Sequence, residues 1–465
     1  MNDYLVLMKS EWLITITIFL LLILKVRGEM RSDRLLSIAQ VMLLIATIVG
    51  FLFNRYGRLF GSMYYTNPLI GFQKALLTLA TYLISLLCAD WFKKTQHLAE
   101  FFILMLTALL GMFLMISSGN LLMFYLSLEL STIPVAALAN FDLEKRISSE
   151  AAMKMILSSA FSSGVLLFGI SLFYGATGTI SFSAMSNHLS GEPLQTLSFI
   201  FLFTAFAFKL SVVPFHLWTA DVYEGSPIAV TSFLSVVSKS AFAFVFLIAI
   251  YKVFYPLEKT WYWLLVITSI ATMVIGNLFA IRQQNMKRFL AYSSIAQVGF
   301  VLVGASAGMS SGTSSVVYFM LIYTFSNLAA FGVVSIISER SGKENMTDYK
   351  GLSRSNPFLS WVMALALFSL AGIPPTAGFF GKLFLLTAGA SRENYWFIVI
   401  ATLNMIISLY YYLRVVRSMF MEKNDNPIQS VAIERSVYFG LILCGVGIVV
   451  TGLFSWLYQY IVSLI

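Results

Sequence analysis

The sequence predicts an all-α polytopic membrane protein with about fourteen transmembrane helices. Of its 465 residues, 59% are hydrophobic and only 11% are charged, whereas soluble domains carry about 25% charged residues. The apolar residues form runs of about 20, which is the length that a helix needs to cross a bilayer. The chain therefore has no room for a sizeable soluble domain.

Fourteen apolar runs give the expected helices in chain order. The loops after odd-numbered helices hold most of the lysines and arginines, which places these loops in the cytoplasm and both termini on the opposite side. The net charge of +9 follows from these loops and indicates no nucleic-acid partner. Because no small-residue cleavage site precedes Arg27, we expect a retained first helix, with a cleaved signal peptide as the alternative. The runs lie at residues 4–25, 35–53, 68–91, 99–116, 119–140, 150–174, 194–219, 228–251, 261–281, 289–308, 313–337, 357–388, 394–420 and 436–460.

Two of these helices are expected to be interrupted. The seventh contains Pro214 and the twelfth contains Pro374 and Pro375, and each proline removes backbone hydrogen bonds that lipid cannot replace. Paired interrupted helices are typical of transporters built from inverted repeats, with their site near the bilayer midplane. We therefore predict a single integral membrane domain over 1–465. Its parts are the first three helices at 1–98, five-helix repeats at 99–251 and 261–420, and a last helix at 436–460.

Four charged residues stand alone in long apolar tracts: Glu129, Lys209, Lys239 and Lys382. An ionisable side chain at bilayer depth costs about 2.5–3.5 kcal/mol on insertion scales unless a polar interior receives it. Fold stability alone does not require such residues. They predict a path for protons or ions through the bundle.

The proposed path depends on how buried lysines hold protons. Burial lowers the pKa of a lysine, and a nearby carboxylate raises it again. Glu129 and Lys209 are therefore expected to form a coupled pair that holds or releases a proton according to their separation. Lys239 and Lys382 would extend the row; the alternative is that all four charges form static ion pairs. The residues expected to organise water between them are Ser293, Ser294, Gln297, Tyr323, Ser326 and Asn327.

Other titratable residues are weaker candidates. Lys154 follows Glu150 by one helical turn, so an interfacial salt bridge and a place in the proton path are both open. His216 either carries protons near neutral pH or makes a structural hydrogen bond. Asp221 and Glu224 are expected in a solvated loop, with a proton exit as the alternative.

The sequence predicts no site for a metal or a redox cofactor. The two cysteines, Cys88 and Cys444, lie in or beside apolar segments, and the three histidines show no metal-binding spacing. The sequence contains neither a CxxC pair nor a GxGxxG turn. We therefore expect the chain to bind no metal ion, iron–sulfur cluster, haem or dinucleotide.

Five segments together resemble the antiporter-like membrane subunits of respiratory complex I, the proton-translocating NADH:quinone oxidoreductase. The resemblance covers nearly the whole chain, and the motifs in combination are highly specific. The segments are LSLELSTIPVAAL at 126–138, FKLSVVPFHLWTADVYEGSPIAVTSFLSVVSKSAFAF at 208–244, RFLAYSSIAQVGF at 288–300, DYKGL at 348–352 and LAGIPPTAGFFGKLFL at 370–385.

The resemblance implies two inverted five-helix units, with helices seven and twelve broken, around a central hydrophilic axis. It matches the four isolated charges to ionisable positions of that axis, and Lys154 to a position on the sixth helix that is often basic. Gln297 departs from the pattern, because many relatives have a histidine there. This departure argues against a protonatable relay on the tenth helix.

The resemblance also implies partners and a location. The chain would translocate protons in a bacterial inner membrane, in contact with lipid and with other membrane and peripheral subunits of complex I. Partner subunits would hold the flavin and the iron–sulfur clusters and reduce quinone. Two alternatives remain open: a subunit of a multi-subunit sodium/proton antiporter, which shares the fold, and a non-conducting membrane scaffold.

Overall fold

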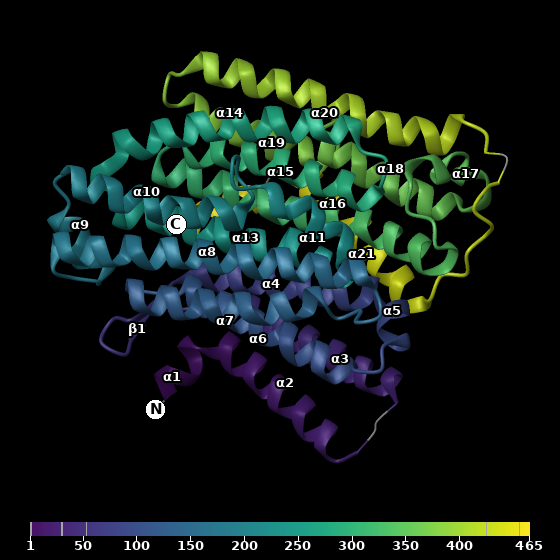
Figure 1. Cartoon of the computed structure of the whole chain (residues 1–465), viewed down its shortest axis with the longest axis horizontal. Coiled ribbons are helices and arrows are strands. Elements are labelled where there is room, and N and C mark those ends of the chain that lie inside the picture. Colours follow the sequence, from purple (N-terminus) through teal and green to yellow (C-terminus); the bar gives the residue numbers. More distant parts are fainter. Residues whose placement is uncertain (1, 29–30, 53, 425, 455) are drawn as a thin grey trace.

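The computed structural model describes residues 2–28, 31–52, 54–424, 426–454 and 456–465, and these residues are helical almost throughout (Figure 1). The apolar runs become helices because only a helix or a closed barrel satisfies every backbone polar group inside a bilayer. A short β-hairpin, β1 (Gly57–Leu59) and β2 (Tyr64–Thr66), connects the second and third predicted helices and was not predicted.

The predicted unbroken helices lie close to their expected bounds. Twelve helices of the described chain are long and apolar enough to cross a membrane, and α2 (Lys9–Val26) and the pair α18 (Pro357–Ala371) and α19 (Ala377–Ala390) account for the other two predicted spans. The unbroken helices are α3 (Ser32–Phe51), α6 (Leu98–Ile116), α7 (Leu121–Ala139), α8 (Arg146–Thr177), α14 (Glu258–Arg282), α15 (Met286–Ala305), α16 (Met309–Ser341) and α20 (Tyr395–Met421).

Several predicted helices are divided into consecutive segments. The eighth predicted helix contains two π-helical stretches, η1 and η2, which sequence periodicity did not indicate. Its segments are α12 (Ile228–Ser232), η1 (Phe233–Ser238), α13 (Lys239–Ile248) and η2 (Ala249–Val253). The other divided helices are α1 (Asn2–Leu7) with α2, α4 (Pro68–Leu87) with α5 (Ala89–Lys94), α10 (Pro193–Leu210) with α11 (Leu217–Gly225), and α21 (Arg435–Leu453) with α22 (Trp456–Ser463). The short connecting elements are α9 (Phe182–His188), η3 (Tyr255–Leu257), η4 (Met346–Tyr349) and α17 (Leu352–Ser355).

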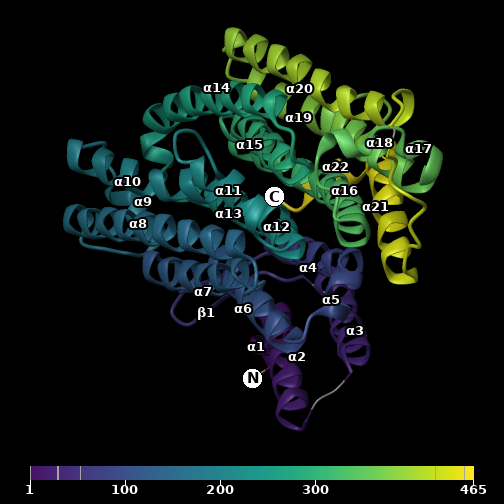
Figure 2. The same cartoon turned by 45° about the vertical axis from the view of Figure 1, so that its right-hand side comes forward.

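The helices differ in how far they are buried. In α15 and α16, 94% of an apolar 18-residue stretch is buried inside the protein, whereas in α8 and α20 only 33% of such a stretch is buried. Helices α1–α3 form the lower edge of the bundle and α20 lies at the upper edge in both views (Figures 1 and 2). The lysines predicted on the seventh, eighth and twelfth helices therefore belong to helices that surround a well-buried centre.

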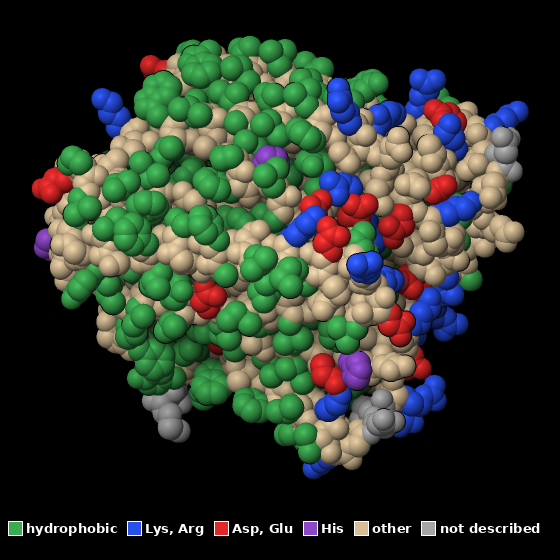
Figure 3. Space-filling view, in the orientation of Figure 1, with side chains coloured by type: hydrophobic (Ala, Val, Ile, Leu, Met, Phe, Trp, Pro, Cys, Tyr) green, Lys and Arg blue, Asp and Glu red, His purple; other side chains and the backbone are tan. Residues whose placement is uncertain are grey.

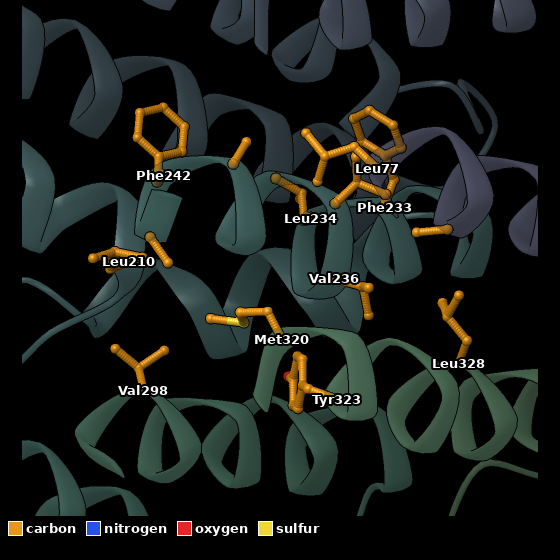
Figure 4. Close-up of a cluster of buried hydrophobic side chains, with 14 of the residues drawn as sticks. Leu77, Leu210, Phe233, Leu234, Val236, Phe242, Val298, Met320, Tyr323 and Leu328 are labelled. Carbon is orange, nitrogen blue, oxygen red and sulfur yellow. The ribbon is translucent and has the colours of Figure 1, made fainter. Parts of the chain in front are cut away.

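The centre of the bundle is packed with apolar side chains from elements far apart in the sequence. Figure 4 shows Leu77 of α4, Phe233 of η1, Val298 of α15 and Met320 of α16 in one cluster of buried side chains. The hydroxyl-bearing Tyr323 lies in the same cluster. Polar groups at this depth must find their hydrogen-bond partners within the protein or in ordered water.

The two ends of the bundle differ in charge. On the face drawn in Figure 3, charged side chains gather at the right, the end where α5 and α17 lie in Figure 1. Hydrophobic side chains cover most of the left and centre of this face. Both termini lie toward the left in Figure 1, the side of the β-hairpin and α9, so they share one end of the molecule.

Candidate functional site

The seventh predicted helix breaks between α10 and α11, directly after Lys209. Ser211 has a φ of +66°, which a residue other than glycine adopts only at a cost. The freed backbone groups find partners inside the bundle: the Trp218 indole donates to the Phe208 carbonyl at 3.1 Å, and the Val213 amide donates to Thr272 at 3.0 Å. The Val213–Pro214 peptide bond in this segment is cis. The break therefore replaces helical hydrogen bonds with side-chain ones, as a membrane interior requires.

Lys209 is held by hydroxyl groups. Its ammonium donates to Thr132 of α7 and Ser159 of α8, at 2.7 Å each, and the residue is 8% exposed. Glu129 lies one helical turn before Thr132, but no ion pair joins it to Lys209 within 4.0 Å. The predicted pair is thus not in direct contact. Glu129 Oε1 is buried and has no partner among the described residues.

A small cavity lies beside Lys209. It has a volume of about 20 Å³ and is lined by Thr132, Ser159, Lys209 and Ser238 among others. Ser238 directly precedes Lys239. A polar space of this size holds about one water, so the cavity offers room for a single water molecule beside Lys209.

Lys239 lies where the π-helical η1 meets α13. Its ammonium donates to Ser294 of α15 at 2.7 Å, and the residue is 1% exposed. π-Helical turns inside helices occur frequently at functional sites. Lys239 thus connects the eighth predicted helix to the tenth, across the middle of the bundle.

The twelfth predicted helix breaks between α18 and α19. Gly372 has a φ of +86°, which glycine adopts readily, and a Cβ there would approach the Lys382 side chain to 3.1 Å. The Lys382 ammonium donates to the carbonyls of Leu370 at 2.7 Å and Ala371 at 3.2 Å. The break includes a cis Pro374–Pro375 bond. It leaves backbone carbonyls free to accept hydrogen bonds from Lys382.

Gln297 connects this break to α15 and α20. Its amide donates to the Leu370 carbonyl at 2.9 Å and to the Tyr412 hydroxyl at 3.1 Å. Ser293 and Tyr412 are 2.5 Å apart. Lys382 and Gln297 therefore share one acceptor, and hydrogen bonds run from Lys382 to Ser293, the neighbour of the Lys239 partner Ser294.

The other polar residues predicted between the lysines form a second group on α16. Asn327 donates to Ser235 at 2.5 Å and to Tyr323 at 2.8 Å. Ser326 donates to Ser369 of α18 at 2.7 Å. All predicted water-organising residues thus lie in buried hydrogen-bonded groups.

Lys154 belongs to a charged cluster near the surface. It pairs with Glu150 and with Asp221 of α11, at 2.7 Å each, while Arg288 of α15 pairs with Asp221 and Glu224 at 2.7 Å each. The prediction of a solvated loop for Asp221 and Glu224 is wrong, because both lie on α11 and are ion-paired. Burial alone would raise the pKa of the Asp221 carboxyl, but its bonds to Lys154 and Arg288 outweigh burial and lower it.

His216 stands apart from the lysines. It lies in the break before α11 and is 7% exposed, and its Nδ1 has no hydrogen-bond partner among the described residues. It makes no hydrogen bond to any of the four isolated charges in that part of the chain. The structure therefore gives His216 no direct contact with the lysine row.

The structure contains a further buried ion pair, Lys74 with Glu11, that was not predicted from the sequence. Lys74 of α4 pairs with Glu11 of α2 at 2.5 Å and donates to Tyr64 of β2 at 3.0 Å, and Lys74 and Glu11 are 2% and 4% exposed. The signal was available, since Lys74 is the only charged residue between Arg58 and Asp90. Its partner could not be identified from sequence, because Glu11 lies near one end of another helix.

Metal ligands do not gather at this site. Among the described residues, no group of three or more histidine, cysteine or acidic side chains could hold a metal ion. The groups along the lysine row are ammonium, hydroxyl, amide and carbonyl groups, which can bind and pass protons through water.

Comparison with known proteins identifies a family to which this chain is similar. A family model described as NADH:quinone oxidoreductase/Mrp antiporter matches residues 118–408. A curated relative named NADH-quinone oxidoreductase subunit N, from Phocaeicola vulgatus, is 48% identical over 405 residues, which is 86% of this chain and 86% of the relative.

Solved structures share the architecture. A chain of respiratory complex I from Thermus thermophilus with bound aureothin superposes with a TM-score of 0.82 at 27% identity, over 96% of this chain and 97% of that chain. A chain of the Mrp complex from Dietzia sp. DQ12-45-1b gives a TM-score of 0.84 at 20% identity, over 97% and 95%. The second likeness shows the fold alone.

Proposed function

The chain belongs to the NADH:quinone oxidoreductase/Mrp antiporter family of membrane subunits, and from that premise we propose that it translocates protons as a subunit of an NADH:quinone oxidoreductase. It takes the place that subunit N has in the relatives of that name. Quinone reduction in partner subunits drives the transfer. The sodium/proton antiporter alternative is less well supported, because the Mrp chain shares only the fold at 20% identity, whereas a relative named subunit N is 48% identical over 86% of this chain.

The observation that carries the proposal is the kind of partner that each buried lysine has. Lys209, Lys239 and Lys382 are at most 8% exposed, and in the described chain their ammonium groups donate only to hydroxyl or carbonyl oxygens. A lysine on neutral oxygens leaves no unpaired carboxylate behind when it loses its proton. Each of the three is therefore suited to carry a proton in one state and to release it in the next.

Hydrogen bonds support a route between Lys239 and Lys382, interrupted only between the adjacent Ser294 and Ser293. Lys239 reaches Ser294, and the neighbouring Ser293 reaches Tyr412 and then Gln297. Gln297 shares the Leu370 carbonyl with Lys382. In this proposal the tenth helix carries protons through hydroxyls and water ordered by Gln297, without a histidine.

Access from the charged end of the bundle follows α8. Lys154 and Ser159 are five residues apart on this helix, about 7.5 Å along its axis, and Ser159 holds Lys209. Ser162 and Ser163 are buried, and their hydroxyls have no partner among the described residues. We assign Lys154 and its ion-paired cluster to the surface end of the route. We assign Glu129, one helical turn before the Lys209 partner Thr132, to the control of Lys209.

The chain itself carries no redox centre in this proposal. The row of lysines and hydroxyls offers no thiolate or imidazole set for iron or haem, and flavin and iron–sulfur clusters belong to partner subunits. An absorbance spectrum and metal analysis of the chain, separated from its partners, should show no stoichiometric chromophore or metal. A chromophore that stays with the chain would contradict this assignment.

We further propose that the charged end faces the cytoplasm of a bacterial inner membrane and that both termini face away from it. Replacement of the buried Cys88 and Cys444 allows single cysteines at Ser341, the last residue of α16, and at the exposed Asn187 of α9. A membrane-impermeant thiol reagent added to intact cells should label Asn187→Cys and not Ser341→Cys. The reverse pattern would invert the orientation.

The central test measures protons moved per electron. Inverted membrane vesicles supplied with NADH are compared for proton uptake, electron-transfer rate and complex abundance on a native gel. We expect Lys209→Ala, Glu129→Ala and Lys382→Ala each to lower proton uptake per electron, while the exposed control Lys94→Ala leaves it unchanged. Lys209→Arg should fail to restore it, because an arginine, with a pKa above about 12, does not release its proton.

The same measurement separates the alternatives. Normal proton uptake per electron in an assembled Lys209→Ala complex would favour the static ion-pair reading and the scaffold. Co-purification with antiporter subunits, and without NADH-oxidising ones, would favour the sodium/proton antiporter.

A further inference from the structure

A cationic cavity lies at the end of the bundle opposite the charged cluster. It has a volume of about 280 Å³, close to the lower limit of about 300 Å³ for small-ligand sites. The β-hairpin, the start of α9 and the end of η2 surround it. This is the end where both termini lie in Figure 1, far along the helices from the Lys154 cluster.

Two basic side chains share this cavity around one aromatic ring. The Lys252 ammonium lies 4.7 Å from the centre of the Tyr65 ring, and the Arg58 guanidinium lies 5.8 Å from it. Both cations line the cavity. Among the side chains that the structure describes, no carboxylate lies within 4.0 Å of either. Two like charges on one ring repel each other, and an anion between them removes that repulsion.

The remaining lining fits a phosphate group. Ser62, Ser118 and Ser183 bring hydroxyls to the same cavity. Hydroxyls and cations together supply the donors that phosphate oxygens accept. The rest of the lining is largely apolar and includes Ile70 and Ile116.

The position of the cavity selects a lipid over a soluble anion. Ile116 is the last residue of α6, and Ile70 lies in the first turn of α4, so the cavity is at the level where membrane helices end and lipid headgroups begin. Leu122 and Leu126 of α7, 48% and 59% exposed, are four residues apart and continue away from the cavity along one helix face. Acyl chains have an apolar surface to follow from this point.

We propose that this cavity binds the phosphate headgroup of an anionic phospholipid, held by Arg58 and Lys252. The lipid seals the junction of the β-hairpin, α9 and η2 on the side opposite the charged end. The site is separate from the lysine row and does not depend on the proposed proton route.

The test uses the whole complex, reconstituted into vesicles that contain a photoreactive phosphatidylglycerol. Cross-linked peptides are mapped by mass spectrometry, and we expect wild-type cross-links in residues 57–66, 118–126 and 248–253. One basic residue near an anionic surface strengthens binding about fivefold, so Arg58→Gln with Lys252→Gln should lower the cross-link yield about 25-fold. The matched control, Arg55→Gln with Lys259→Gln, removes two exposed charges outside this cavity and should keep the yield.

Further arms separate the possible occupants. Arg58→Lys with Lys252→Arg keeps both charges and should retain cross-linking, which guards against a folding defect in the glutamine variants. A photoreactive phosphatidylcholine should cross-link more weakly than phosphatidylglycerol. Equal yields in the wild type and the glutamine variant would overturn the proposal. Complete displacement by millimolar inorganic phosphate, or cross-links from this cavity to an acidic segment of a neighbouring subunit, would also overturn it.

Discussion

Two regions of the molecule bury lysines in opposite ways. Lys74, among the first three membrane helices, contacts the Glu11 carboxylate and the Tyr64 hydroxyl. Lys209 and Lys382, in the two broken helices, donate hydrogen bonds only to neutral oxygens among the described residues. All three are almost fully buried, so burial by itself does not identify a proton carrier. The hydrogen-bond partner distinguishes the two kinds of lysine. A lysine paired with a carboxylate resists the loss of its proton, whereas a lysine bonded to neutral oxygens can release it.

The comparison predicts its largest effect on stability at Lys74. Lys74→Ala leaves the Glu11 carboxylate buried without its cation, and removing one member of a buried pair costs about 3–5 kcal/mol. We expect a lower thermal transition of the purified complex and less assembled complex. Lys74→Met together with Glu11→Leu removes both charges and should restore most of the loss. A stable Lys74→Ala complex that moves fewer protons per electron would place Lys74 among the proton carriers. The type of partner would then no longer distinguish structural lysines from carriers.

Lys209 should show the reverse pattern. Lys209→Met removes a buried charge that has no carboxylate in contact, and Thr132 still donates to the Leu128 carbonyl at 2.8 Å. The thermal transition should therefore change by less than the equivalent of about 1.5 kcal/mol, while proton uptake per electron falls. A loss of stability as large as that of Lys74→Ala would show that Lys209 is a structural cation.

Much of this arrangement could be predicted from sequence. The isolated positions of Lys209, Lys239 and Lys382 identified charges that the structure places at the broken helices or on the polar row between them, and Glu129 lies one helical turn from a Lys209 partner. The prolines located both breaks, because proline removes a backbone donor wherever it stands. Apolar run length located the spans for the same local reason.

The rest depended on contacts between distant segments. The Lys209 cage of Thr132 and Ser159 draws on three helices, and hydroxyls this common carry no sequence signal. The π-helical turn before Lys239 is set by packing, since its residues are also compatible with a regular α-helix. The Glu11 partner of Lys74 is 63 residues away. One sequence cannot report such pairings.

Gln297 offers a smaller and sharper test of the hydroxyl route. Gln297→Leu removes two hydrogen-bond donations, to the Leu370 carbonyl and to Tyr412, worth about 1 kcal/mol each. We expect slower proton uptake per electron with little change in assembly. Gln297→His should keep proton uptake and introduce a dependence on pH between about 5 and 8, where histidine titrates. Unchanged uptake in Gln297→Leu would remove this residue from the route.

The smallest expected effect is at Asp221, where the surface cluster resembles Lys74 more than the lysine row. Asp221 is partly exposed and pairs with Lys154 and Arg288, so Asp221→Asn should lower the stability of the complex by about 1 kcal/mol. The pKa of this carboxyl is lowered despite burial, so its contribution is present above the ordinary value of about 3.9 and is lost only as pH falls through the lowered value. The difference in thermal transition between wild type and variant should therefore stay constant from about pH 5 to 8 and shrink below about pH 4. A difference that changes between pH 6 and 8 would mean that Asp221 takes up a proton in the working range, and the surface cluster would then belong with the carriers and not with the static pairs.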